Sequence, residues 1–279
     1  MRHPGIILLF FILQVFIAAG VSADNNCLDD TICIEASGDK GFVDFHVRNL
    51  KAVDITFTLT LNVSNLQPPE NLPYTETVSG HGKVNLFRLP VIDTKRKWRY
   101  TYHADWTRGS RYAKHDNSYI YRLPYEKGKS YKIGQACKGR FSHDDNSQYA
   151  VDFLMPEGTP VHAARDGIVV ETRDQSDKGG PSRDYEDLAN HVIIRHQDGT
   201  TGEYLHLKKG GAAVKEGDRV KRGDLIGYSG NTGFSDGPHL HFGVYKAYDG
   251  KKRISFPVKF RSPRGIVSCP AVGESYEAE

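Results

Sequence analysis

The sequence predicts an all-β protein in which a small β-sandwich-like domain precedes a second domain built on an antiparallel sheet. Several short runs alternate between apolar and polar residues, which is the period of a strand with one buried face. The 28 glycines and 15 tyrosines favour strands joined by turns. A chain of 279 residues is long enough to build two hydrophobic cores.

Residues 1–23 are predicted to be a signal peptide. Arg2 supplies a positive start, residues 6–17 are apolar apart from Gln14, and Val21-Ser22-Ala23 has the small residues of a cleavage site. We expect cleavage after Ala23, which leaves a protein that is secreted or lies in the periplasm or cell envelope without a transmembrane anchor. The alternative is an uncleaved anchor, although the apolar run is short for a span of about 20 residues.

Residues 24–125 are predicted to form the N-terminal β-domain. Strands are expected near residues 41–47, 53–61 and 98–103, and the second of these alternates Ile, Phe and Leu with Thr, which suits a sheet with one wet face. This part contains no chemical constellation, so wall recognition, substrate positioning and latency all stay open for it. Residues 126–133 are predicted as a linker, residues 134–270 as the second domain, and residues 271–279 as a polar tail without regular structure.

The four cysteines lie in the part expected to be exported, where an even number predicts two disulfides. Of the three pairings, we favour Cys27–Cys33, which closes a short local loop, and Cys137–Cys269, which joins the start of the second domain to its end. The alternative is a zinc site of four cysteines, but no Cys-x-x-Cys pair is present.

The second domain is predicted as a series of strands separated by glycine turns. Residues 161–170 indicate a strand, a turn and a strand. The strand over 191–196 is followed by Asp198-Gly199, a hairpin signal, and by a returning strand over 202–207. A glycine-rich loop over residues 230–237 then leads directly into His239.

Two histidines spaced two residues apart, His239 and His241, predict a reactive site. Successive side chains of a strand alternate between its faces, so both imidazoles should face one site while Leu240 and Phe242 enter a core. Catalytic zinc sites commonly use three protein ligands, and the candidate partners are His143, Asp152 and His206. The residues alone predict this set but do not divide roles between His239 and His241.

Residues 139–247 resemble the zinc endopeptidases of the lysostaphin and LytM type. His143 and Asp152 precede the stretch Pro-Glu-Gly-Thr-Pro-Val over residues 156–161, and three further motifs follow in the family's order: Tyr204-Leu205-His206-Leu207, Gly223-Asp224-Leu225-Ile226-Gly227, and the stretch from Gly230 to Phe242. The spacing from His143 to Asp152 is longer than in the best-known members. The Pro-Glu-Gly-Thr-Pro stretch identifies Asp152 as the matching residue, with Asp144 or Asp145 as the alternative ligand.

The resemblance implies one zinc ion held by His143, Asp152 and His241. It also implies a catalytic pair beside the metal, for which we assign His239 as the general base and His206, as imidazolium, as the stabiliser of the oxyanion. Four neighbouring residues are predicted to contact substrate: Asn190, Tyr204, Thr232 and Ser235. Tyr204 is included because strand alternation puts it on the same face as His206.

These features predict a secreted zinc metalloendopeptidase that hydrolyses peptide bonds in peptidoglycan stem or cross-bridge peptides. The alternative is a non-catalytic cell-wall-binding or regulatory module on the same fold. The net charge of +3 lacks the basic footprint of a nucleic-acid binder, so we expect peptidoglycan or another peptide, and no nucleic acid, as the partner.

Overall fold

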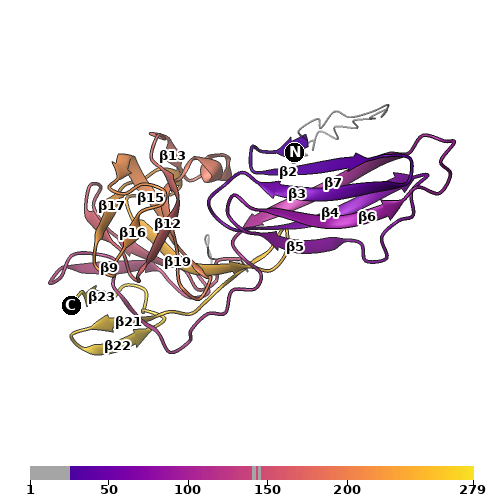
Figure 1. Cartoon of the computed structure of the whole chain (residues 1–279). Helices are drawn as coiled ribbons and strands as arrows, with labels where there is room; N and C mark the ends of the chain where they lie inside the picture. Colours follow the sequence, from indigo (N-terminus) through magenta and orange to yellow (C-terminus); the bar gives the residue numbers. More distant parts are fainter. Residues whose placement is uncertain (1–25, 140–142, 144–145) are drawn as a thin grey trace, which may run out of the picture.

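The computed structural model describes residues 26–139, 143 and 146–279 (Figure 1). The predicted signal peptide and its cleavage site lie outside these residues, as do Asp144 and Asp145. The prediction of an all-β fold is confirmed, because the described part is built of strands with one short 3-10 helix, η1 (Arg183–Leu188). None of the helices in the described ranges has the length and apolar character that a membrane crossing requires.

The N-terminal strands form two antiparallel sheets (Figure 1). One contains β1 (Asn26–Leu28), β2 (Ile32–Gly38), β3 (Phe42–Asn49) and β6 (Lys83–Pro90), and the other β5 (Tyr74–Val78), β4 (Ile55–Ser64) and β7 (Arg99–Arg108). Ile34 and Val47 of the first sheet share a core cluster with Ile55 and Phe57 of the second. The sheets therefore bury their apolar faces against each other, and the Cys27–Cys33 disulfide ties β1 to β2.

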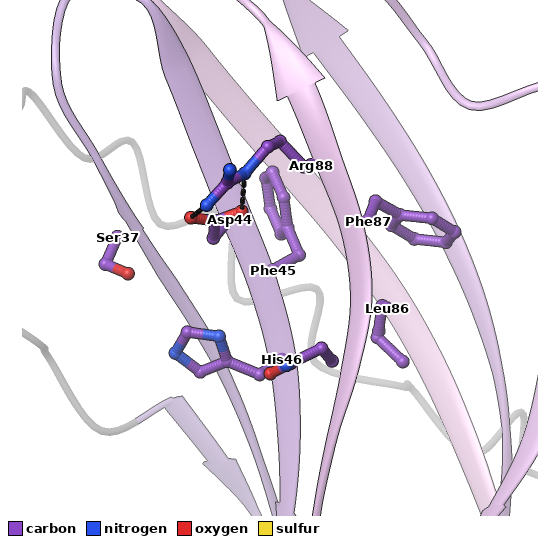
Figure 2. A pocket seen from close by; sticks show the side chains of 8 residues that line it. Ser37, Asp44, Phe45, His46, Leu86, Phe87 and Arg88 are labelled. Carbon is purple, nitrogen blue, oxygen red and sulfur yellow. Dashed lines mark hydrogen bonds and ion pairs between the residues drawn. The ribbon is translucent and has the colours of Figure 1, made fainter.

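Residues of β2, β3 and β6 line a pocket of about 390 Å³ (Figure 2). Its polar lining includes His46 and Asn85, and Arg88 donates to both carboxylate oxygens of Asp44 across it, at 2.8 and 2.9 Å. None of the predicted site residues lines this pocket.

The second domain is organised around one large sheet. Its main path of neighbouring strands runs in this order: β16 (Arg219–Val220), β12 (Gly167–Arg173), β14 (Asn190–Arg195), β15 (Thr201–Ala212), β19 (Leu240–Ala247), β10 (Val151–Leu154), β9 (Ser130–Gln135) and β23 (Ser275–Glu277). β11 (Pro160–His162), β17 (Leu225–Ser229) and β20 (Arg253–Ser255) pair beside this path, and β13 (Gly179–Gly180) pairs with β18 (Gly233–Phe234). The predicted hairpin over 191–207 is present as β14 and β15.

The boundary between the domains differs from the predicted linker. Residues 126–133 include the first four residues of β9, which pairs with both β10 and β23. The preceding strand β8 (Ile120–Arg122) runs parallel to β21 (Lys259–Ser262), which also pairs with β22 (Gly265–Ser268), and Tyr121 is fully buried in the core of the second domain. Pairings this distant in the sequence leave no local signal, so a polar run with Gly128, just after Pro124, resembled a linker.

The predicted polar tail is also structured. β23 is an edge strand of the large sheet, and Ala278 is 1% exposed in the main core cluster. The Cys137–Cys269 disulfide fixes the segment just before it, so both predicted disulfides are present.

Candidate metal centre and catalytic residues

Pairing between β10 and β19 builds the centre of the site. Asp152 lies directly opposite His241 in this antiparallel ladder. His239 precedes β19 by one residue and forms an isolated bridge with Gly230. Leu240 and Phe242 are fully buried, so the predicted alternation holds here, with both imidazoles facing the site and both apolar neighbours in the core.

Three donor groups converge at this point, from His143, Asp152 and His241. Their ligand atoms all lie within 4.8 Å of one another. Oδ1 of Asp152 is 3.2 Å from Nε2 of His143 and 2.9 Å from Nδ1 of His241. Two imidazole nitrogens and a carboxylate form a donor set that suits zinc and related divalent ions.

The hydrogen bonds of His143 are consistent with a cation between these donors. Its Nδ1 lies 3.2 Å from the carbonyl oxygen of Ala136, which can only accept, so Nδ1 carries a proton. In a neutral ring, the lone pair is then on Nε2 and faces the Asp152 carboxylate. Two lone pairs at this distance require a cation between them or a second proton on the ring, and a metal ion satisfies the first condition.

The electrostatics keep Asp152 ionised. Burial acts to raise the pKa of this carboxyl, but the hydrogen bonds that His143 and His241 donate when no cation lies between them, and the charges of nearby histidines, outweigh burial and hold the pKa well below its ordinary value. Burial lowers the pKa of His241, which favours the neutral ring that can bind a metal. The carboxylate and the imidazole are therefore both in ligand form near neutral pH.

Two residues that the sequence analysis missed orient these donors. The hydroxyl of Tyr245 lies 3.0 Å from Nε2 of His241, which leaves Nδ1 directed at Asp152. Gln135 donates from Nε2 to Oδ2 of Asp152 at 3.1 Å, which leaves Oδ1 to the histidines. Tyr245 follows His241 by four residues in the same strand, so alternation could have found it. Gln135 joins the site only through the pairing of β9 with β10.

A β-bulge aims His206 at the site. Asn190 pairs with Leu207 and His191 with Leu205, so His206 is the extra residue of β15. Its φ of +66° is in the left-handed region, which is uncommon for a residue other than glycine and which costs of order 1–3 kcal/mol. The bulge reverses the alternation locally and directs the imidazole toward the ring of His239, with 4.5 Å between the ring centroids.

Both histidines of this pair present Nε2 to the site. Nδ1 of His206 donates to the carbonyl oxygen of Thr232 at 2.7 Å, and Nδ1 of His239 donates to that of Gly237 at 2.8 Å. Each neutral ring therefore keeps its lone pair on Nε2, and Nε2 of His239 lies 3.9 Å from Oδ1 of Asp152. Burial, together with the neighbouring His239 and His241, lowers the pKa of His206 to about 3.

The four residues predicted to contact substrate are buried, and their side chains are bonded within the protein. Tyr204 is fully buried, and its hydroxyl accepts from the backbone N–H of Ala164 at 2.7 Å. Asn190 is also fully buried, and its amide holds the backbone of Ser176. The bulge explains why Tyr204 and His206 do not face the same side: the extra residue at His206 interrupts the alternation that predicted a shared face.

Thr232 and Ser235, at 5% and 2% exposure, support His206 and His239. Thr232 holds His206 through its carbonyl oxygen, and its hydroxyl donates to the carbonyl oxygen of Leu207 at 2.8 Å. Oγ of Ser235 lies 3.2 Å from Nδ1 of His239. Both residues position histidines, and contact with substrate stays a prediction for them.

Comparison with known proteins confirms the predicted resemblance. Residues 146–254 match the sequence model of Peptidase family M23. The chain is 46% identical over 91 residues to the peptidoglycan DD-endopeptidase ShyA of Vibrio cholerae, covering 33% of this chain and 18% of that protein. It is 38% identical over 135 residues to lysostaphin of Staphylococcus simulans, covering 47% of this chain and 24% of that protein.

Among solved structures, the catalytic domain of lysostaphin from Staphylococcus simulans is 32% identical, with a TM-score of 0.32, over 47% of this chain and 88% of that chain. The present chain spans no more than about a quarter of the length of the two curated relatives described above.

Proposed function

We propose that this chain is a secreted zinc endopeptidase that cleaves peptide bonds of peptidoglycan, because residues 146–254 match the sequence model of Peptidase family M23. The observation that carries the proposal is the convergence of five side chains at one point: His143, Asp152, His206, His239 and His241. The similarity to proteins named as peptidoglycan or glycyl-glycine endopeptidases supports the substrate class. The predicted signal peptide supports export to the cell envelope.

We propose that one zinc ion is held by Nε2 of His143, a carboxylate oxygen of Asp152 and Nδ1 of His241. When bound, zinc supplies a Lewis acid that polarises a peptide carbonyl and lowers the pKa of a water molecule. The role of the three side chains is to hold this ion with fixed tautomers, which Ala136 enforces for His143 and Tyr245 supports for His241.

His239 serves as the general base. Its Nε2 lone pair accepts a proton from the attacking water and returns that proton to the leaving amine. The backbone of Gly237 fixes the ring throughout by accepting from Nδ1. Once protonated, His239 also offers an N–H that can stabilise negative charge on the carbonyl oxygen.

His206 acts as a neutral ring, which revises the imidazolium role that the sequence suggested. Burial disfavours its charged form, and the adjacent ring of His239 makes a second positive charge on the pair costly. With Nδ1 bonded to Thr232, Nε2 can accept a hydrogen bond from the water and orient it toward the carbonyl carbon.

The test is hydrolysis of purified peptidoglycan by the full chain after chelation and after readdition of zinc, with the released peptides identified by mass spectrometry. We expect chelation to abolish cleavage, zinc to restore it, and His241→Ala to lose both bound zinc and activity. His103→Ala, which changes an exposed histidine of the N-terminal domain, is the matched control. Cleavage that persists at full rate in zinc-free protein would remove the proposal, and so would a zinc-loaded protein that cleaves no peptide substrate.

A further inference from the structure

The ion pair between Arg108 and Glu171 joins the N-terminal domain to the sheet that carries the catalytic histidines. Arg108, the last residue of β7, donates from Nε to Oε2 of Glu171 in β12 at 2.7 Å and from Nη2 to Oε1 at 2.9 Å. Both side chains are about three-quarters buried, at 25% and 26% exposure. Bidentate pairs in such surroundings fix geometry as well as charge.

Glu171 passes this constraint to β14. Its Oε1 is 3.0 Å from Nε2 of His191, and Nδ1 of the same imidazole donates to the carbonyl oxygen of Ala189 at 3.1 Å. His191 and Asn190 are the two residues that flank the register shift opposite His206. Arg108 therefore holds, through Glu171 and His191, the regular strand against which the bulge forms.

The same segment is joined to the hydrogen bond that orients His206. The backbone N–H of Asn190 donates to Oγ1 of Thr232 at 2.9 Å, and the carbonyl oxygen of Thr232 accepts from Nδ1 of His206. A continuous series of contacts thus joins the N-terminal domain to Thr232, whose carbonyl oxygen fixes the tautomer of His206. A bulged residue with positive φ keeps its conformation only where its surroundings enforce it.

The two domains also share a core. Val170 of β12 and Ile193 of β14 belong to the same buried cluster as Ile34 and Phe57 of the N-terminal sheets. The turn after β19 packs against β4, because Gly250 donates its backbone N–H to Oγ1 of Thr58 at 2.9 Å, and a Cβ at Gly250 would lie 2.6 Å from the backbone nitrogen of Thr58. Removing the N-terminal domain would therefore expose apolar side chains of β12 and β14, and β14 pairs with the strand that carries His206.

We propose that the N-terminal domain is a permanent support of the peptidase site and that Arg108 is a positioning residue for His206. The proposal rests on the proposed function for its kinetic consequence only. By this proposal the N-terminal domain positions catalytic residues and does not keep the enzyme latent. Activity therefore requires the domain and falls when the Arg108–Glu171 pair is broken. Glu171 and His191 act in the same path, without touching the three candidate metal donors.

The experiment compares the full mature chain with Arg108→Met and Arg108→Lys. The first substitution keeps the apolar stem, and the second keeps the charge and safeguards folding but loses the bidentate geometry. Arg195→Met is the matched control, because Arg195 also pairs across the domain interface, with Asp54 at 3.5 Å. Arg195 lies at the opposite end of β14 from Asn190 and His191, and within the described residues its side chain bonds none of Glu171, His191 and Thr232. The readouts are kcat, KM, zinc content, and the imidazole Nδ1–H signal of His206 in NMR spectra, assigned by its loss in His206→Gln.

We expect Arg108→Met to lower kcat about tenfold or more, with zinc content and KM close to those of wild type and with the His206 signal shifted or exchange-broadened. Arg108→Lys should lie between Arg108→Met and wild type, and Arg195→Met should match wild type. An unchanged His206 signal in both Arg108 variants would overturn the proposal, as would equal effects in Arg195→Met. If wild type cleaves no substrate, the proposed function fails, while the NMR signal still decides whether Arg108 positions His206.

Discussion

Removal of one hydroxyl, in Tyr245→Phe, is expected to weaken metal binding without disturbing the fold. The Tyr245 hydroxyl lies 3.0 Å from Nε2 of His241, and this contact leaves Nδ1 for the metal. Phenylalanine keeps the buried ring in place, including its stacking under the Arg253 guanidinium, whose carbon lies 4.0 Å from the ring centroid. Among the described residues, the hydroxyl's hydrogen bond to His241 and its weaker contact with Ser147 are the interactions lost.

The size of the effect follows from the buried nitrogen. His241 is 8% exposed, so water has little access to an Nε2–H group that has lost its acceptor. An unsatisfied buried donor costs roughly 1–3 kcal/mol, which corresponds to about 5- to 150-fold in an equilibrium constant. Partners of metal-bound histidines typically account for 10- to 100-fold in metal affinity, so we expect the zinc Kd of Tyr245→Phe to rise by about 10- to 100-fold.

The assay is competition for zinc against a chromophoric chelator at fixed pH. The matched control is Tyr125→Phe, because Tyr125 is equally buried in the core of the second domain and donates its hydroxyl to the carbonyl oxygen of Tyr276 at 2.6 Å, away from the metal donors. This variant should lose about 1 kcal/mol of stability and retain the zinc affinity of wild type. Equal zinc affinities for wild type and Tyr245→Phe would refute the argument that this hydroxyl fixes the His241 tautomer.

Three further predictions follow from the bulge, the domain interface and the long disulfide. In urea titrations, His206→Gly should be about 1 kcal/mol more stable than His206→Ala, because glycine adopts a φ of +66° at little cost. Both variants should lose hydrolysis. Equal stabilities of the two variants would contradict backbone strain at this residue. Burial acts to raise the pKa of Glu171, but its hydrogen bond to His191 and the charge of Arg108 outweigh burial and lower the pKa to about 2 from an ordinary 4.5. The stabilisation from ionised Glu171 is therefore complete above pH 4.5 and decreases as the pH falls toward 2, by roughly 3 kcal/mol at most. Glu171→Gln should flatten the fall in melting temperature between pH 5 and 3. If the melting temperatures of wild type and Glu171→Gln fall in parallel over this range, this carboxylate is not the cause. Replacement of Cys137 and Cys269 by serine should lower the free energy of unfolding by roughly 2–5 kcal/mol in urea titrations, because the bridge closes a loop with a sequence separation of 132. The same loss of stability in reduced wild type would identify the bridge itself as the source. An unchanged free energy of unfolding would contradict the prediction.

The sequence was a good guide wherever local alternation and motif order carried the information. His239 and His241 share a side because Leu240 and Phe242 must enter the core, and this rule needs no knowledge of distant strands. The ordered motifs also indicated His143, Asp152 and His206, which the fold brings together from three separate segments. The same alternation failed at Tyr204 because a non-glycine residue adopts positive φ two positions later, and nothing in the sequence around His206 marks a bulge.

The remaining errors come from contacts that are distant in sequence. The strand that contains Tyr121 pairs with residues around Phe260, and the strand that begins within the predicted linker pairs with residues 275–277. Gln135 reaches Asp152 through the same pairing. A histidine or carboxylate motif reports which groups are available for chemistry. Which neighbours hold those groups depends on the register between strands, and a single sequence does not encode register locally.

The separation of the metal donors along the chain has a consequence for how the protein folds. Asp152 and His241 are 89 residues apart, and they become neighbours only when β10 and β19 pair. Closing a loop of this length is entropically costly, so this pairing cannot form as an early local event. A divalent ion therefore finds its complete set of ligands only on a chain whose strands have already assembled. An ion bound by these residues should therefore slow unfolding far more than it speeds folding, because its ligands meet only after the strands have paired.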